Sequence, residues 1–261
     1  MTECILLDKK QIANQLHRDD VMIDIFQSLA STNDYLKSLP HELQTRICLA
    51  EQQTQGKGRF NRRWYSPFAE NIYFSCAFSF NKNIKELTGL SLVVSLATLR
   101  VLQHYQLNGF MVKWPNDVLF QQQKISGNLI EITNAANSLC RIIIGIGINI
   151  NMLDDEINIP QSWISLRKIT HQYIDRNKLC AQLFNQLEAD VVKFIFHGLI
   201  IFMADWKKVD MLQGKMINLL LGSQKFTGIA KGIDQHGHLL LELPNGDIKS
   251  FSAGETSLLK S

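Results

Sequence analysis

A basic segment with two glycines is the first part of the chain whose residue types suggest chemistry. It runs from Glu51 to Trp64 and reads Glu-Gln-Gln-Thr-Gln-Gly-Lys-Gly-Arg-Phe-Asn-Arg-Arg-Trp. Glycine lets a backbone approach a ligand closely, and exposed amides with Lys57, Arg59 and Arg62 can surround phosphate or carboxylate oxygens. The segment lacks the Gly-x4-Gly-Lys-Ser/Thr pattern, so it is no P-loop. We expect an anion-binding loop; a solvated basic loop is the alternative.

A second pattern lies in residues 141–151, where isoleucine alternates with small or amide residues. One strand face is apolar, and the other carries Gly145, Gly147, Asn149 and Asn151. Glycine weakens a strand, so two at this spacing indicate that a ligand or another backbone lies against the cleared face. A tightly packed sheet or a pair of bulges is the alternative. The pair is no dinucleotide fingerprint, because a third glycine and a strand-to-helix turn are missing.

Two more segments place polar residues beside predicted strands. Lys113-Trp-Pro-Asn-Asp117 ends one strand, and its proline holds Asn116 and Asp117 in a defined turn. A purely structural turn is the alternative. Lys124 precedes a glycine-containing strand, from which its ammonium can reach a carboxylate or phosphate on the cleared face.

These segments need a scaffold, and the hydrophobic pattern predicts a mixed α/β domain followed by a small β-barrel. The expected strands are 23–26, 47–51, 71–80, 110–114, 124–132 and 141–150. The expected helices are 8–18, one begun by Ser31-Thr32-Asn33, 87–104 and 176–206. After Asp210, short β-like runs alternate with turn sequences at 216–221, 226–233, 238–243 and 248–251. Trp163 and Trp206 are expected to be packing anchors.

The composition limits the function classes. No apolar run is long enough to span a membrane, and the first ten residues lack a secretory signal, so we expect a cytoplasmic location. The five widely spaced cysteines indicate reduced, mostly buried thiols. A net charge of +3 is too small to imply nucleic-acid binding. Residues 8–18 hold one short helix, fewer than a helix-turn-helix reader needs, so we expect no N-terminal DNA-binding domain and no DNA partner.

Together the motifs resemble the ordered motif set of biotin–protein ligases. They are Ser31-Thr-Asn33, the loop Gly56-Lys-Gly-Arg-Phe-Asn-Arg-Arg-Trp64, Lys113-Trp-Pro-Asn-Asp117, Lys124-x-x-Gly127-x-Leu-x-Glu131 and Gly145-x-Gly-x-Asn149. The segments 228–234 and 251–258 resemble the small SH3-like domain of that family. One motif alone is weak, but the whole set in this order and spacing is specific.

The resemblance implies an α+β fold, with a mixed central β-sheet flanked by helices, of class II synthetase and biotin ligase type, and a small C-terminal SH3-like β-barrel. It implies a catalytic domain at 1–211, in which 1–20 form a short N-terminal extension, and an SH3-like domain at 212–261. The expected enzyme is monofunctional. It forms biotinyl-5′-AMP from biotin and ATP with Mg²⁺, and then biotinylates a lysine of the biotin carboxyl carrier protein of acetyl-CoA carboxylase or a similar carboxylase.

The resemblance also implies roles for single residues. It assigns the biotin head group to Ser31, Thr32, Asn33 and Gln53, and the walls around the ligand to Trp64, Gly145 and Gly147. It assigns the adenylate to a loop with Gly56, Lys57, Gly58, Arg59 and Arg62, and to Asn116, Asn149, Gly127 and the central Lys124. It assigns catalysis to Lys124, Arg59 and Asp117, of which Asp117 meets the substrate lysine. No residue is implied as a dedicated metal ligand.

The sequence departs from the family pattern at three positions. The usual loop is Gly-Arg-Gly-Arg-x-Gly-Arg, and here Lys57 replaces the first arginine while Asn61 replaces the last glycine. Lysine keeps the charge but loses the planar bidentate fork, and asparagine tolerates left-handed backbone angles. Leu259 stands where the family often has an arginine, which puts a nucleotide contact in doubt, with Lys260 as the candidate substitute.

Other functions stay open at this point. A lipoate or octanoate ligase or transferase shares the fold, but the Lys113–Asp117 turn and Trp64 favour biotin. A non-catalytic biotin-binding protein has no need of a phosphate-binding loop. A biotin-responsive repressor needs the DNA reader that residues 8–18 are too short to form. An exposed edge strand near the glycine strand would allow a homodimer.

Overall fold

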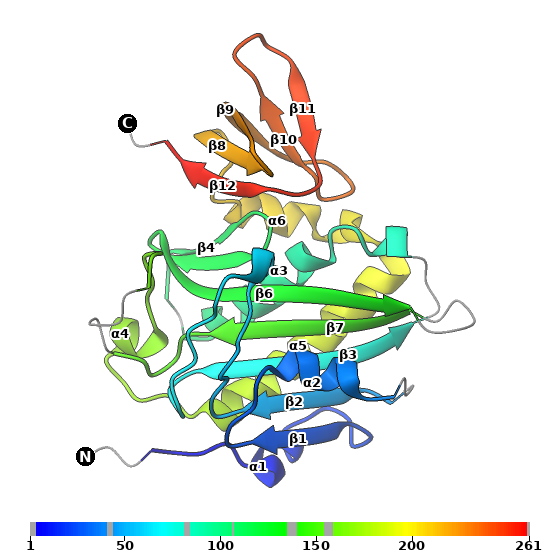
Figure 1. Ribbon diagram of the computed structural model, residues 1–261, viewed down its shortest axis with the longest axis vertical. Helices are drawn as coiled ribbons and strands as arrows, with labels where there is room; N and C mark the ends of the chain where they lie inside the picture. Colours follow the sequence, from blue (N-terminus) through cyan, green and yellow to red (C-terminus); the bar gives the residue numbers. More distant parts are fainter. Residues whose placement is uncertain are drawn as a thin grey trace.

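The computed structural model describes residues 4–40, 44–80, 84–105, 107–134, 140–153 and 159–259, which form two sheets. The larger sheet has seven strands in the order β1-β2-β3-β7-β6-β5-β4, and the smaller has five in the order β11-β10-β9-β8-β12. In Figure 1 the large sheet fills the body of the molecule, and the small sheet stands above it at one end. This arrangement confirms the expected α+β fold with a small C-terminal β domain.

All six strands expected in the large sheet are present, with bounds within two residues of those expected. The sheet consists of β1 (Met22–Phe26), β2 (Arg46–Ala50), β3 (Ile72–Phe80), β4 (Phe110–Lys113), β5 (Asp117–Phe120), β6 (Gln123–Asn134) and β7 (Cys140–Ile148). Strand β5 was not predicted from the sequence, because it is short and its first residue, Asp117, belongs to the predicted turn. The pairing is parallel between β1 and β2 and antiparallel across the rest.

The expected free edge beside the glycine strand is wrong. The glycine strand is β7, and it pairs with β3 on one side and with β6 on the other. The outer strands of the described sheet are β1 and β4. A homodimer formed through an edge next to β7 therefore has no basis in this fold.

The helices differ from expectation mainly near residue 198. They are α1 (Lys9–Ala13), α2 (Thr32–Ser38), α3 (Leu90–Gln103), α4 (Leu166–Thr170), α5 (Arg176–His197) and α6 (Met203–Val209), with short 3-10 turns η1 (Arg59–Asn61), η2 (Ile84–Leu87) and η3 (Leu199–Phe202). The single helix expected over 176–206 is wrong. Gly198 takes a positive φ of 70° and caps α5, so the chain turns there into η3 and α6.

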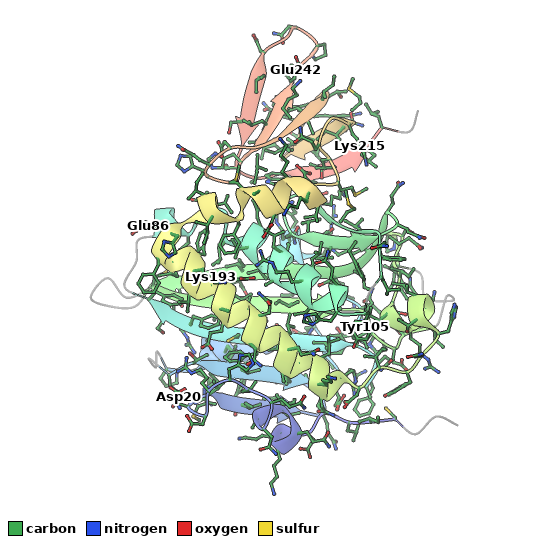
Figure 2. The ribbon with its side chains drawn as sticks, turned by 180° about the vertical axis from the view of Figure 1, so that it is seen from behind. Asp20, Glu86, Tyr105, Lys193, Lys215 and Glu242 are labelled. Atoms are coloured by element: carbon green, nitrogen blue, oxygen red, sulfur yellow. The ribbon has the colours of Figure 1, made fainter. Side chains whose placement is uncertain are left out.

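Two layers cover the two faces of the large sheet. Helices α3 and α5 pack on one face, and they lie in front of the sheet when the molecule is seen from behind in Figure 2. Ile142, Ile144, Ile146 and Ile148 of β7 face this layer and are buried in the main core, whereas Ile143 faces the other way and packs against Leu36 of α2. On the opposite face lie α2 and the long connection between β2 and β3, which crosses in front of β7 and β6 in Figure 1. The predicted alternation of β7 is thus confirmed.

The small domain is a five-stranded antiparallel sheet attached to the turn between β4 and β5. Its strands are β8 (Met216–Leu221), β9 (Gln224–Ile233), β10 (Leu239–Glu242), β11 (Ile248–Phe251) and β12 (Glu255–Leu258), of which β12 was not expected. Trp114 Nε1 donates to Gly237 O at 3.0 Å, and Thr256 Oγ1 donates to Trp114 O at 3.2 Å. The buried apolar side chains of the small domain belong to the same core cluster as those of the large sheet.

The structure bears on two expectations drawn from the composition, namely the state of the cysteines and the lack of a membrane-spanning segment. Four of the five thiols are buried and unpaired, whereas Cys4 is exposed. None of the helices in the described ranges is long and apolar enough to cross a membrane.

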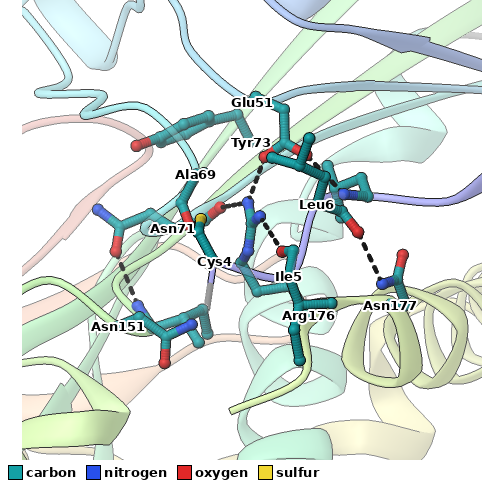
Figure 3. Close-up of polar contacts among 12 residues, drawn as sticks. Cys4, Ile5, Leu6, Glu51, Ala69, Asn71, Tyr73, Asn151, Arg176 and Asn177 are labelled. Carbon is teal, nitrogen blue, oxygen red and sulfur yellow. Dashed lines mark hydrogen bonds and ion pairs between the residues drawn. The ribbon is translucent and has the colours of Figure 1, made fainter. Parts of the chain in front are cut away.

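A buried ion pair ties residues 4–8 to the large sheet (Figure 3). Arg176, which is 1% exposed, donates from Nη1 to Glu51 Oε2 at 2.7 Å and from Nη2 to Ile5 O at 2.8 Å. Glu51 Oε1 in turn accepts from the backbone of Leu7 at 2.5 Å. Residues 4–8, expected as part of an N-terminal extension, are therefore bonded to the start of α5 and to Glu51, which follows β2.

Replacing Arg176 with methionine should destabilise the protein by about 3–5 kcal/mol, because a buried carboxylate would lose its partner. Urea unfolding measures this change in the free energy of unfolding. The double variant Arg176→Met with Glu51→Leu removes both charges and should recover most of the loss. A single variant as stable as the unaltered chain would show that the pair is not what fixes residues 4–8.

Candidate active site

A cavity of about 910 Å³ opens on the glycine face of the large sheet, within the size range of ligand sites. Of the site residues expected from the sequence, all but one line it. The exception is Gly56, where an added Cβ would lie 2.9 Å from both Gln53 Nε2 and Ser66 Oγ. Gly56 therefore permits close packing at the base of the loop, and the structure brings the other predicted residues together around one space.

One row of cross-strand partners organises the floor of this cavity. Lys113 of β4 pairs with Asp117 of β5, Asp117 with Gly127 of β6, Gly127 with Gly147 of β7, and Gly147 with Tyr73 of β3. Directly opposed residues present their side chains on the same face of a sheet. The two glycines thus leave a gap in the middle of the row, between an aromatic side chain and two charged ones.

Side chains of the basic loop, of α2 and of β6 itself occupy the space that the glycines leave. A Cβ at Gly147 would lie 2.4 Å from a ring carbon of Trp64, and one at Gly145 would lie 2.3 Å from Asn33 Oδ1. A Cβ at Gly127 would lie 2.9 Å from Lys124 Cε. Glycine is required at 145 and 147 because these neighbours are held close to the backbone.

Neutral polar groups gather at one end of the cavity. Gln53 Oε1 accepts from Thr32 N at 2.9 Å and from Thr32 Oγ1 at 3.0 Å. Ser75 Oγ lies 2.7 Å from Thr32 Oγ1 and 2.6 Å from Asn33 Oδ1. Ser31 caps α2 and so fixes the helix start that presents Thr32 and Asn33. These hydroxyl and amide groups can hydrogen-bond a neutral polar ligand.

Ser75 supports the site from beneath, and the sequence analysis missed it. It is a fully buried hydroxyl in a mostly apolar strand, its register partner is Gly145, and it bonds Thr32 and Asn33, which line the cavity. A polar residue at a core position of a predicted strand was the signal that could have found it.

A chain of ion pairs connects the basic loop to α2 and β6. Lys57 Nζ lies 2.6 Å from Asp34 Oδ2, and Lys37 Nζ lies 3.3 Å from Asp34 Oδ1 and 2.7 Å from Glu131 Oε1. Glu131 Oε2 also accepts from Asn33 Nδ2 at 2.8 Å. Burial pushes the pKa of Asp34 upward, but its hydrogen bonds to Lys57 and Lys37 outweigh this and hold the pKa below its usual value. Asp34 is therefore an anionic anchor for the start of the loop.

Positive charge gathers at the other end of the cavity. Lys124 Nζ lies 2.7 Å from Asp117 Oδ1 and 5.3 Å from the ring centroid of Trp64. Arg59 Nη1 donates to Gly254 O at 3.4 Å, and burial lowers the pKa of its guanidinium. Arg62 pairs with Glu255 of β12. The loop thus bridges the large sheet and the small domain while directing cations toward the cavity.

The two asparagines expected near the nucleotide line the cavity, but their amides bond the backbone. Asn116 Nδ2 donates to Asn128 O at 2.7 Å. Asn149 Nδ2 donates to Lys124 O at 3.3 Å and to Ile164 O at 3.2 Å. Both side chains therefore hold the strand ends in place around Lys124.

Trp163 is not the packing anchor that the sequence suggested. Its half-buried side chain lines the cavity, with Lys168 Nζ 4.0 Å from the ring centroid. Trp206 does pack in the core, as expected.

Leu259 is 42% exposed, and Lys260 lies outside the described residues. Within the described ranges, no three His, Cys, Asp or Glu side chains are grouped as metal ligands.

Replacing Glu255 with glutamine should loosen the basic loop from the small domain. The Arg62–Glu255 pair is partly exposed, and such pairs contribute roughly 1 kcal/mol or less. Trypsin should then cut the loop up to about fivefold faster after Arg59, Arg62 or Arg63. The matched control is Glu242→Gln, which removes the Lys231 pair within the small domain. Equal cleavage in both variants would exclude the interdomain contact as a restraint.

Comparisons with known proteins agree with this geometry. Residues 25–149 match the biotin/lipoate A/B protein ligase family, and residues 213–259 match the biotin protein ligase C-terminal domain. The bifunctional ligase/repressor BirA of Escherichia coli is 37% identical over 97% of this chain and 78% of that protein. The biotin–[acetyl-CoA-carboxylase] ligase of Mycobacterium tuberculosis is 27% identical over 82% of this chain and 79% of that protein.

Solved structures show the same relationship. The biotin protein ligase of Aquifex aeolicus in complex with biotin and ATP superposes with a TM-score of 0.78 and 30% identity, covering 92% of this chain and 99% of that one. The biotin protein ligase of Leishmania major in complex with biotinyl-5-AMP gives a TM-score of 0.60 at 22% identity, which supports the fold alone. With two matching domain models and a relative that is 37% identical over 97% of this chain, the chain belongs to the biotin protein ligase family.

Proposed function

We propose that this chain joins biotin to a carrier-protein lysine in two steps, through a biotinyl-adenylate made from ATP. The observation that carries the proposal is the cavity itself. It has neutral hydrogen-bonding groups at one end, cations at the other, and a glycine-cleared floor between them. Biotin has matching parts: a neutral ureido ring, an apolar chain and a carboxylate.

Biotin fits the cavity in one direction. The hydroxyl of Thr32 and the amides of Asn33 and Gln53 suit the ureido head group, which both donates and accepts hydrogen bonds, and Ser75 holds Thr32 and Asn33 from beneath. Trp64, whose ring packs on Gly147, would form the wall beside the apolar part. The carboxylate then points toward Lys124, whose ammonium lies beside the Trp64 ring.

In the first step a carboxylate oxygen of biotin attacks the α-phosphorus of ATP, and pyrophosphate leaves. Two anions must approach one another, so the site has to offset their repulsion. Lys124 and Arg59 supply positive charge there, and such fixed charges stabilise a transition state by several kcal/mol. On binding, the phosphate oxygens would replace Asp117 as the partner of Lys124.

Mg²⁺ would accompany ATP and neutralise charge on the leaving pyrophosphate. The two carboxylates at the cationic end, Asp117 and Glu255, are already paired with Lys124 and Arg62. Phosphate oxygens and water suffice to hold this ion, and magnesium keeps several waters in such sites. The described residues therefore fit an ion that arrives with the nucleotide.

In the second step the carrier lysine attacks the carbonyl carbon of the adenylate, and AMP leaves. The incoming ammonium must first lose a proton, and Asp117 can accept it once Lys124 has turned to the phosphate. Water must stay out because it would hydrolyse the adenylate. The loop anchored by Lys57 and Arg62 covers the intermediate and serves as the lid.

The proposal also covers the acceptor protein and a second candidate function. We propose the biotin carboxyl carrier protein of a biotin-dependent carboxylase as acceptor, by analogy with the named activity of the Mycobacterium tuberculosis relative. The name of the Escherichia coli relative adds a repressor activity to the ligase activity, so repression is the second candidate function. A monofunctional enzyme without DNA binding, a domain boundary at 211/212, a cytoplasmic location and a homodimer stay predictions.

Biotin should drive ATP–pyrophosphate exchange by the purified protein, and lipoate or octanoate should not. Lys124→Met should lower the exchange rate by at least a hundredfold, because charge stabilisation at the α-phosphate is lost. Lys193→Met, on the helix layer behind the sheet, is the control and should keep full activity. Exchange with lipoate alone would move the chain to lipoate ligase chemistry, and no exchange with any acid would favour a binding protein.

Gly147→Ala should weaken biotin binding roughly tenfold or more, because a methyl group would displace the Trp64 ring at a cost of about 1–3 kcal/mol. Titration calorimetry with biotin measures the effect. Ile146→Val is the control, since it removes a methyl group from the opposite, helix-covered face of the same strand. If Gly147→Ala binds biotin as tightly as the unaltered chain, Trp64 does not form the wall of the biotin site.

A further inference from the structure

Lys113 is a cation of the cavity to which none of the steps above gives a role. It ends β4, where Val112 is fully buried against the core and Lys113 lies on the opposite, cavity-lining face. Its register partner is Asp117, so both side chains stand on the same face of the sheet.

The side chain of Lys113 lacks the protein partner that its neighbours have. Lys57, Arg59, Arg62 and Lys124 each bond a carboxylate or a carbonyl oxygen. Within the described residues, the half-buried ammonium of Lys113 has neither a hydrogen bond nor an ion pair. Taking a charge out of water without a partner costs free energy, so packing alone does not account for it.

Other charges around Lys113 place its ammonium at the cationic end of the cavity. Burial lowers the pKa of Lys113, and Lys124 and Arg62 lower it further, while Asp117 and Glu255 act against them. The two carboxylates therefore do not offset burial and the neighbouring cations. An anionic ligand at this place would give the ammonium the bonded partner that it lacks.

The position along the row suggests which anion this is. Lys113 lies two strands beyond Gly127, over which the end of Lys124 is placed. Neighbouring strands are about 4.8 Å apart, so Lys113 lies roughly 10 Å further along the sheet, away from the head-group end. If Lys124 holds the α-phosphate, a chain of further phosphates running along the row reaches Lys113.

We infer that Lys113 binds the β- and γ-phosphates of ATP and then the pyrophosphate that leaves. This inference rests on the proposed function and adds a leaving-group site to it. In the reaction, a bond forms between a biotin carboxylate oxygen and the α-phosphorus. The bond from the α-phosphorus to the bridging oxygen breaks, and its electron pair departs with pyrophosphate. Lys113 offsets the negative charge that builds up on that group.

The test separates the two half-reactions in Lys113→Met, which keeps the side-chain length and removes the charge. The first is biotin-dependent ATP–pyrophosphate exchange, and the second is transfer from pre-made biotinyl-5′-adenylate to the carrier. We expect kcat/KM for ATP in the first to fall roughly ten- to hundredfold, the size of a lost charge-assisted contact. Pyrophosphate should also inhibit adenylation less. Transfer from the adenylate should change less than about twofold, since no phosphate leaves beyond the α-position.

Two more variants make the outcome decisive. Lys113→Arg keeps the charge and should recover most of the exchange activity. Lys231→Met removes an exposed lysine of the small domain that pairs with Glu242, and it should alter neither half-reaction. Thermal unfolding identifies a variant that does not fold, in which case pyrophosphate binding by calorimetry is compared between Lys113→Gln and the unaltered chain.

Two results would overturn the inference. One is unchanged ATP kinetics in Lys113→Met, with pyrophosphate inhibition intact. The other is a loss confined to the transfer step, which would assign Lys113 to the carrier instead. Failure of the proposed function looks different, because the unaltered chain itself would then show no biotin-dependent exchange.

Discussion

The absence of side chains at Gly127 and Gly147 is the constraint on which the site depends. The two residues oppose one another in the middle of the large sheet, so the floor of the cavity is bare backbone across two strands. Trp64 and Lys124 come within contact distance of that floor only because no Cβ occupies it. The rest of the fold supports this gap: α3 and α5 bury the opposite face, and β3 and β5 carry the polar and charged groups on either side.

The cations of the site are held by partners that a ligand can replace. Lys57 rests on Asp34, Arg62 on Glu255 and Lys124 on Asp117, so the loop is pinned at both ends while the cavity stays open to an anion. The Lys57 and Arg62 pairs are partly exposed, so each contributes little to stability, and exchanging one for a phosphate contact costs little. The small domain participates directly, since Glu255 and the carbonyl of Gly254 hold two of the loop arginines.

The sequence predicted the parts of this arrangement that have a local pattern. The alternation of Ile142–Ile150 with glycine and asparagine predicted a cleared strand face, and the structure confirms it. What depends on tertiary contact was not predictable: Ser75 comes to support the site through its register with Gly145, and Trp163 reaches the cavity through the chain that follows β7. The break at Gly198 was missed because the apolar pattern continues across it. Binding roles for single residues were implied by resemblance and remain to be tested.

A crystal structure of the protein with biotin and a non-hydrolysable ATP analogue tests the central claim most directly. We expect the ureido ring against Thr32, Asn33 and Gln53, the carboxylate and α-phosphate at Lys124, and the outer phosphates toward Lys113, with the sheet unchanged. Biotin bound in the opposite direction, or away from the face cleared by Gly145 and Gly147, would contradict it.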